Sequence, residues 1–139
     1  MSTLVVGYDG SDCARAALET AIGVAGAFGD GIVVVFAYQV SRLGGEVEDY
    51  ARALRERATE VLGHAVDQAA AHGVTVATEV AEEGPAKALV DAAAAHDARA
   101  IVVGTRGEHP LKGALVGSTP HRLLQIADRP LLVVPDTGA

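Results

Sequence analysis

The 139-residue sequence has a single cysteine, no tryptophan and few aromatic residues, which make up 4% of the chain. One cysteine cannot form an internal disulfide, so a disulfide framework is excluded and a reducing compartment is indicated. Cys13 falls near the start of a predicted helix, where a thiolate is favoured, but it has no recognisable partner or motif. We therefore interpret it as a small structural residue and expect Ala, Val and Leu to build the core.

Long apolar runs and an excess of basic residues are also missing. No segment reaches the ~18 apolar residues of a membrane-spanning helix, and the N-terminus lacks the basic region of a secretory signal. Eleven Lys and Arg against eighteen Asp and Glu give a net charge of −7, which argues against nucleic acid or an anionic membrane as the main partner. We expect a cytoplasmic protein with neither partner, in which any anionic ligand is bound by local groups.

Apolar segments alternate with helical patterns along the whole chain. Strands are predicted at 3–8, 32–38, 74–80, 100–103 and 131–134, and helices at 12–28, 46–71, 85–96 and 120–127. Strict alternation predicts a single α/β domain over residues 1–139, with a doubly wound five-stranded parallel sheet and four helices on both faces. The segment 74–80 alternates apolar and polar residues, which predicts an edge strand. Ser11 is the predicted N-cap of the first helix, and Tyr50 is among the expected core contacts of the second.

The most informative segment is GTRGEHPLKGALVGST, residues 104–119, which lies between a predicted strand and a predicted helix. Its glycines follow a fixed spacing of two and then nine residues, at Gly104, Gly107 and Gly117. A strand, a glycine loop and a helix start together bind phosphate, because glycine allows close backbone approach and positive φ and the helix start offers unpaired N–H groups. Ser118 and Thr119 add hydroxyl donors. We therefore predict a phosphate site here, with positive φ at Gly117.

Glycines alone fit a plain strand-to-helix connection equally well, because tight turns need glycine for steric reasons. Two nucleotide motifs are absent. Lys112-Gly113 is in the wrong order for a P-loop, and no G-x-G-x-x-G follows the first strand. The connection is nevertheless long, with twelve residues between Gly104 and Gly117, and loops of that length in compact domains are usually functional or mobile.

Asp9 is the candidate for the other half of the site. In open α/β sheets, ligands bind outside the carboxyl ends of the strands, where the winding reverses. Asp9 directly follows the first strand and faces the glycine loop if the first and fourth strands are neighbours. Its carboxylate would accept a hydrogen bond from a ribose hydroxyl or an exocyclic amine. Gly7, which has no side chain, would keep the wall of this crevice thin. The alternative is an Asx turn that caps the first helix, and both roles are compatible through different oxygens.

These residues resemble the universal stress protein family, in its ATP-binding subgroup, within the wider group of adenine-nucleotide α-hydrolase-like folds. The segment VVGYDGS at 5–11 is similar to the family's first strand and its acidic residue. The Gly104, Gly107, Gly117-Ser118 spacing fits the subgroup without a gap, and LLVVP at 131–135 is similar to its last strand. The resemblance extends over essentially the whole chain.

The resemblance implies a 3-2-1-4-5 strand order, bound ATP with Mg²⁺ or Mn²⁺, and a homodimer whose last strands, at 131–134, pair antiparallel. Asp9 and the backbone at Ala37 would bind the adenine and ribose. The phosphates would be surrounded by Gly104, Arg106, Gly107, Gly117, Ser118 and Thr119. Two departures stand out. Ala37 is smaller than the valine often found there, which predicts a looser base pocket, and Pro120-His121 is not the commonest continuation.

A catalytic set is not recognisable. Glu108 and His109 lie in the long loop and His121 on the following helix, and none has an identifiable partner of the kind that proton transfer needs. We therefore predict a nucleotide-dependent dimeric regulator or interaction protein of the stress response rather than an enzyme. Two alternatives remain open. One is a slow ATPase or autophosphorylating protein, with Ser118 or Thr119 as acceptor, and the other is an AMP or cyclic-nucleotide binder.

Overall fold

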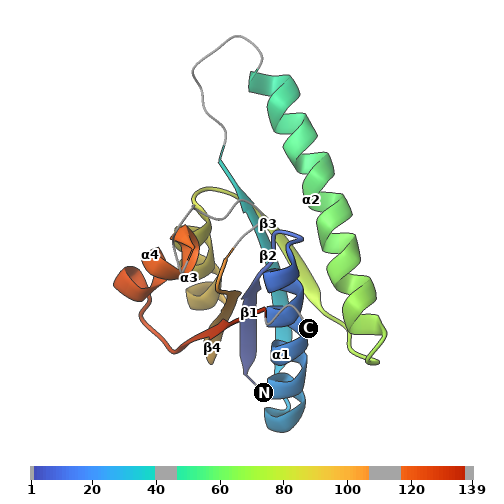
Figure 1. Ribbon diagram of the computed structural model, residues 1–139, viewed down its shortest axis with the longest axis vertical. Helices are drawn as coiled ribbons and strands as arrows, with labels where there is room; N and C mark the ends of the chain where they lie inside the picture. Colours follow the sequence, from blue (N-terminus) through green and yellow to red (C-terminus); the bar gives the residue numbers. More distant parts are fainter. Residues whose placement is uncertain (1, 40–46, 107–116, 137–139) are drawn as a thin grey trace.

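A computed structural model describes residues 2–39, 47–106 and 117–136 of the chain. In these residues strands and helices alternate strictly (Figure 1), as the sequence predicts. The elements are β1 (Thr3–Gly7), α1 (Asp12–Phe28), β2 (Gly31–Tyr38), α2 (Val47–Ala70), β3 (Ala77–Glu82), α3 (Pro85–Ala95), β4 (Ala100–Gly104), α4 (Ser118–Ile126) and β5 (Leu131–Val134). In this described part of the chain, no helix combines the length and the apolar character needed to cross a bilayer.

The five strands form one parallel sheet in the order β3-β2-β1-β4-β5, which confirms the order implied by the family resemblance. β1 lies at the centre, with Val5 opposite Val33 of β2 on one side and Ile101 of β4 on the other. The winding reverses between β1 and β4, since the chain moves outward from β1 through β2 to β3 and then returns to β4. The carboxyl ends of these two strands therefore border the crevice where ligands bind in such sheets.

Helices cover both faces of the sheet, as predicted. α1 and α2 pack on one face and α3 and α4 on the other (Figure 1), and each pair encloses its own apolar cluster. Successive strand residues point to opposite faces. In β1, Leu4 and Val6 join the cluster under α1 and α2, whereas Val5 joins the cluster under α3 and α4. β3 and β5 form the edges, so the prediction of an edge strand from its alternating pattern is confirmed.

Two predicted boundaries are wrong by a few residues. β3 was expected at 74–80 but spans Ala77–Glu82, because its ladder with β2 begins where Ala77 meets Val33 and the residues before it still follow the end of α2. α4 was expected from residue 120 but begins at Ser118 after the N-cap Gly117. Pro120 therefore lies in the first turn, where a missing N–H group costs no intrahelical hydrogen bond.

Tyr50 was predicted to contact the core, and this is wrong: its side chain is 54% exposed. The first turns of α2 extend beyond the sheet (Figure 1), so the apolar stripe of the helix has no sheet to cover there. Burial begins further along the helix at Ala58, which is fully buried together with Ala65 and Ala69.

An ion pair at the amino ends of the strands links the connections that precede β2 and β4 to the residue before β1. The Asp30 carboxylate accepts hydrogen bonds from Arg99 Nε at 2.6 Å and Nη2 at 3.2 Å and from the Ser2 backbone N–H at 3.2 Å. The Arg99 guanidinium also lies over the Phe28 ring, 4.5 Å from its centroid. The hydrogen bonds from Arg99 hold the pKa of Asp30 below its ordinary value of 3.8.

This pKa shift predicts part of the acid sensitivity of the protein. The unfolded chain binds a proton to Asp30 at higher pH than the folded protein does, so the ion pair stabilises the fold above about pH 4 and is lost as pH falls further. Asp30→Asn removes this titration. We therefore expect urea unfolding free energies measured between roughly pH 5 and pH 3 to fall less steeply for the variant than for the wild type. Equal slopes would contradict the assignment, since Asp91 and Asp128 titrate in both proteins.

Candidate functional site

The turn after β1 places Asp9 at the carboxyl edge of the sheet. Asp9 Oδ1 accepts a hydrogen bond from the Ser11 N–H at 3.0 Å, and Ser11 Oγ accepts one from the Ala14 N–H at 3.1 Å. The Asx turn that the sequence offered as an alternative is therefore present, and Ser11 is the N-cap as predicted. Gly10 between them has φ +86°, a left-handed conformation that favours glycine. This turn fixes Asp9 beside the start of α1.

Gly7, the last residue of β1, has a packing role in this structure. A Cβ atom added to it would lie 2.9 Å from Leu89 Cδ1 and 3.1 Å from Val103 Cγ1. The missing side chain thus lets α3 approach the centre of the sheet. Gly7 faces the α3 side, and so does Ala37 of β2, which packs against the same apolar cluster.

Gly104 ends β4 and faces the opposite helix layer. A Cβ atom on it would lie 2.6 Å from Cys13 Cβ and 2.7 Å from both the carbonyl carbon and the carbonyl oxygen of Cys13. The first turn of α1 therefore rests directly on this glycine. Cys13 Sγ also lies 3.7 Å from Thr105 Oγ1, so the only cysteine of the sequence contacts the residue that follows β4.

Gly117 caps α4 and returns the chain to the end of β4. Its N–H donates a hydrogen bond of 2.6 Å to the Thr105 carbonyl oxygen. The prediction of positive φ at Gly117 is wrong, because its φ is −69° and its ψ is 173°. Extended backbone is what a helix N-cap normally adopts, so the cap position rather than a left-handed turn sets this conformation. Arg106 is exposed, whereas Gly107, Glu108 and His109 lie outside the described residues.

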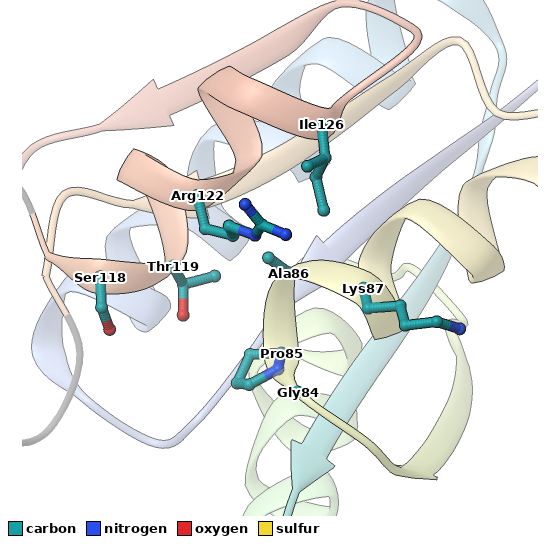
Figure 2. Close-up of a pocket in the computed structure, with 8 residues that line it drawn as sticks. All are labelled: Gly84, Pro85, Ala86, Lys87, Ser118, Thr119, Arg122 and Ile126. Carbon is teal, nitrogen blue, oxygen red and sulfur yellow. The ribbon is translucent and has the colours of Figure 1, made fainter.

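A groove of about 440 Å³ opens between the starts of α3 and α4 (Figure 2). Two predicted site residues, Ser118 and Thr119, line it from the first turn of α4. The sequence analysis did not predict the other residues that line the groove. They lie at the start of the predicted helix at 85–96, or just before it, and along the predicted helix at 120–127: Gly84, Pro85, Ala86, Lys87, Arg122 and Ile126. Gly84 also approaches Gln39, just beyond Ala37, since a Cβ on Gly84 would lie 3.7 Å from the Gln39 amide group.

The first turns of α3 and α4, which lie beside the groove, differ from the first turns of α1 and α2 in their acidic residues. α1 begins with Asp12, and α2 has Glu48 and Asp49 in its first turn. α3 and α4 have neither an acidic residue in the first turn nor a side chain that caps it. In α4 the free N–H groups and the positive dipole end are therefore not neutralised by a carboxylate of the first turn, which favours an anion there. At α3 a carboxylate does lie close by, since Glu83 precedes the N-cap Gly84 and pairs with Lys87.

The two cations of the groove are in different surroundings. Lys87 Nζ donates to Asp91 at 2.7 Å and to Glu83 at 3.0 Å, and these hydrogen bonds raise its pKa above the ordinary value of 10.5. Arg122 Nη1 donates to the neutral Gln125 Oε1 at 3.3 Å. Three or more His, Cys, Asp or Glu side chains do not gather into a metal-binding group anywhere in the described ranges.

The sequence is similar to one family of known proteins over nearly its whole length. The sequence profile of the "Universal stress protein family" matches residues 1–135. A universal stress protein of Methanocaldococcus jannaschii is 32% identical over 136 residues, an alignment that spans 94% of this chain and 80% of the relative.

Solved structures show the same fold. A universal stress protein determined in complex with cAMP is 28% identical, with a TM-score of 0.77 and 96% of each chain covered. A second, the universal stress protein UspA from Lactobacillus plantarum, is 21% identical with a TM-score of 0.83, and the alignment covers 96% of this chain and 97% of that one.

Proposed function

Because this chain belongs to the universal stress protein family, we propose that it binds an adenine nucleotide, ATP, at the carboxyl ends of β1 and β4. The whole chain, residues 1–139, forms a single nucleotide-binding domain in this proposal. It acts as a nucleotide-dependent regulator or interaction protein of the stress response, by binding rather than by turnover.

One observation carries the proposal: α4 starts at the carboxyl end of β4 with its first turn open to a groove. The bond from Gly117 to Thr105 fixes that start beside the winding reversal of the sheet. Free N–H groups at a helix start bind phosphate oxygens, and the hydroxyls of Ser118 and Thr119 line the same groove. The absence of carboxylates from this first turn leaves the site suited to phosphate.

The remaining parts of the nucleotide follow from the positions of the strand ends. Asp9 and the backbone at Ala37 bind ribose and adenine in this proposal. The phosphates lie among residues on both sides of the long connection after β4, namely Gly104, Arg106, Gly107, Gly117, Ser118 and Thr119. Mg²⁺ or Mn²⁺ accompanies ATP in this proposal. The described residues contain no group of three metal-binding side chains, and this is compatible with the proposal because Mg²⁺ bound with nucleotides takes many of its ligands from phosphates and water.

We also propose that the functional unit is a homodimer formed through β5. This strand is one edge of the sheet, and Leu132 on it is 37% exposed. An unpaired apolar edge is a template for pairing with another chain, and a second copy of β5, running antiparallel, would cover it.

Cyclic AMP is a second candidate ligand, because the relative solved with cAMP is 28% identical over nearly the whole chain. The two candidates differ in the charge that the phosphate region must neutralise. A triphosphate presents several negative charges to the start of α4, whereas a cyclic monophosphate presents one.

Thermal unfolding during nucleotide titration tests the proposal. A ligand that binds only the folded protein adds RT ln(1 + [L]/Kd), or about 2.7 kcal/mol at a hundredfold excess over Kd. For a domain of this size we expect the midpoint to rise by several degrees with Mg-ATP. GTP, AMP and cAMP serve as comparisons on protein first freed of co-purified nucleotide. A larger rise with cAMP than with ATP would favour the second candidate, and no rise with any of them would contradict nucleotide binding.

A further inference from the structure

Arg122 is the feature of the groove that the proposed function leaves without a role. Residues three and four apart lie on the same face of a helix, so Arg122 shares a face of α4 with Ser118 and Thr119. All three line the groove. Figure 2 shows the guanidinium of Arg122 extending from α4 toward Ala86 at the start of α3, while the Lys87 ammonium points away from it.

The charge of Arg122 is not neutralised within the described part of the chain. There its guanidinium has no carboxylate within 4.0 Å, and its hydrogen bond to Gln125 involves a neutral amide. The other cation of the groove differs in this respect, because Lys87 pairs with Glu83 and Asp91. Arg99 and Arg129, elsewhere in the fold, each pair with at least one aspartate. Arg122 is therefore an exposed cation at the groove that no carboxylate of the described residues neutralises, although the net charge of the chain is −7.

We propose that Arg122 is a specificity-determining residue that makes the site favour the more highly charged adenine nucleotide. This inference rests on the proposed nucleotide function. A groove of about 440 Å³ lies within the usual range for small-molecule sites, ~300–1,000 Å³. Guanidinium is always charged, and its planar set of donors matches phosphate oxygens. Because Coulomb attraction grows with ligand charge, Arg122 strengthens ATP binding more than ADP binding, and cAMP binding least.

The test compares nucleotide affinities of the wild type, Arg122→Gln and Arg122→Lys by isothermal titration calorimetry. Arg55→Gln is the matched control, because Arg55 is exposed on α2, which packs on the opposite face of the sheet. Loss of one charge-assisted hydrogen bond predicts that the ATP Kd of Arg122→Gln rises about tenfold. The cAMP Kd should rise less than about twofold, since a single ligand charge gains less from the arginine. Arg122→Lys should keep most of the preference, and Arg55→Gln should change neither Kd.

Three results would overturn the inference. Equal weakening of ATP and cAMP in Arg122→Gln would mean that Arg122 does not discriminate by charge, and an unchanged ATP Kd would mean that it does not act on the ligand. Either result would leave the proposed function intact, because the wild type would still bind ATP. A wild-type protein that binds none of the nucleotides would refute the proposed function and this inference together. Unfolding midpoints measured without ligand show whether Arg122→Gln folds normally.

Discussion

Gly104→Ala is expected to destabilise the protein by about 3 kcal/mol, at the upper end of the usual range for overpacking. Its added Cβ atom would lie 2.6 Å from Cys13 Cβ and 2.7 Å from the Cys13 carbonyl group. A flexible side chain can rotate away from such a contact, but a backbone carbonyl in the first turn of α1 cannot. The helix start would have to move off the end of β4, and with it the turn that carries Asp9. Urea denaturation measures the loss.

Gly23→Ala is the matched control for this substitution. Gly23 lies within α1, and a Cβ atom added to it meets nothing within 4 Å. An alanine in a helix interior is favoured over glycine by roughly 0.5–1 kcal/mol, so this variant should be slightly more stable than the wild type. If Gly104→Ala were as stable as Gly23→Ala, the contact between α1 and β4 would not be as close as described.

Leu123→Ala is expected to cost about 3–4 kcal/mol, in the middle of the range for buried leucines. Leu123 is fully buried in the apolar cluster under α3 and α4. α4 has nine residues, of which only Pro120 and Leu123 are buried. An isolated helix of this length is not stable in water, so α4 depends on its packing against the sheet, to which Leu123 contributes the most buried side chain and Ile126 a partly buried one. We therefore expect faster amide exchange throughout α4, together with weaker ATP binding, because Ser118 and Thr119 lie in its first turn.

The neighbouring residue provides the control. Leu124 follows on the same helix and is 69% exposed, so Leu124→Ala removes the same atoms from a solvent-facing position. Substitutions of this kind usually change stability by no more than about 0.5 kcal/mol. Comparable destabilisation in both variants would show that Leu123 is not the anchor of α4. If Leu123→Ala lost stability but kept rigid, protected α4 amides, Pro120 and the α3 contacts would have to account for the attachment.

Local features of the chain were predictable from the sequence because they depend on neighbouring residues. The alternation of strands and helices follows from apolar periodicity, and the cap at Ser11 follows from a hydroxyl placed just before a helical pattern. The strand order was predicted from the family resemblance, because no local pattern in the sequence specifies which strands lie next to each other. The boundary of β3 was less accurate, because a strand begins where its partner strand pairs with it. The start of α4 was placed two residues late, because Pro120 was taken as the first helical residue although proline also fits within the first turn.

The composition and spacing of the chain by themselves determined the α/β class, the edge position of β3 and the location of a glycine-rich connection after β4. Tertiary structure alone decided what the glycines do there. Gly104 meets Cys13, Gly7 meets Leu89, and Gly117 caps a helix in extended conformation. It also brought Arg122 to a groove with the start of α3. The physical reason is that packing and charge act over a few ångströms between residues far apart in the chain, and these distances exist only once the helices have docked on the sheet.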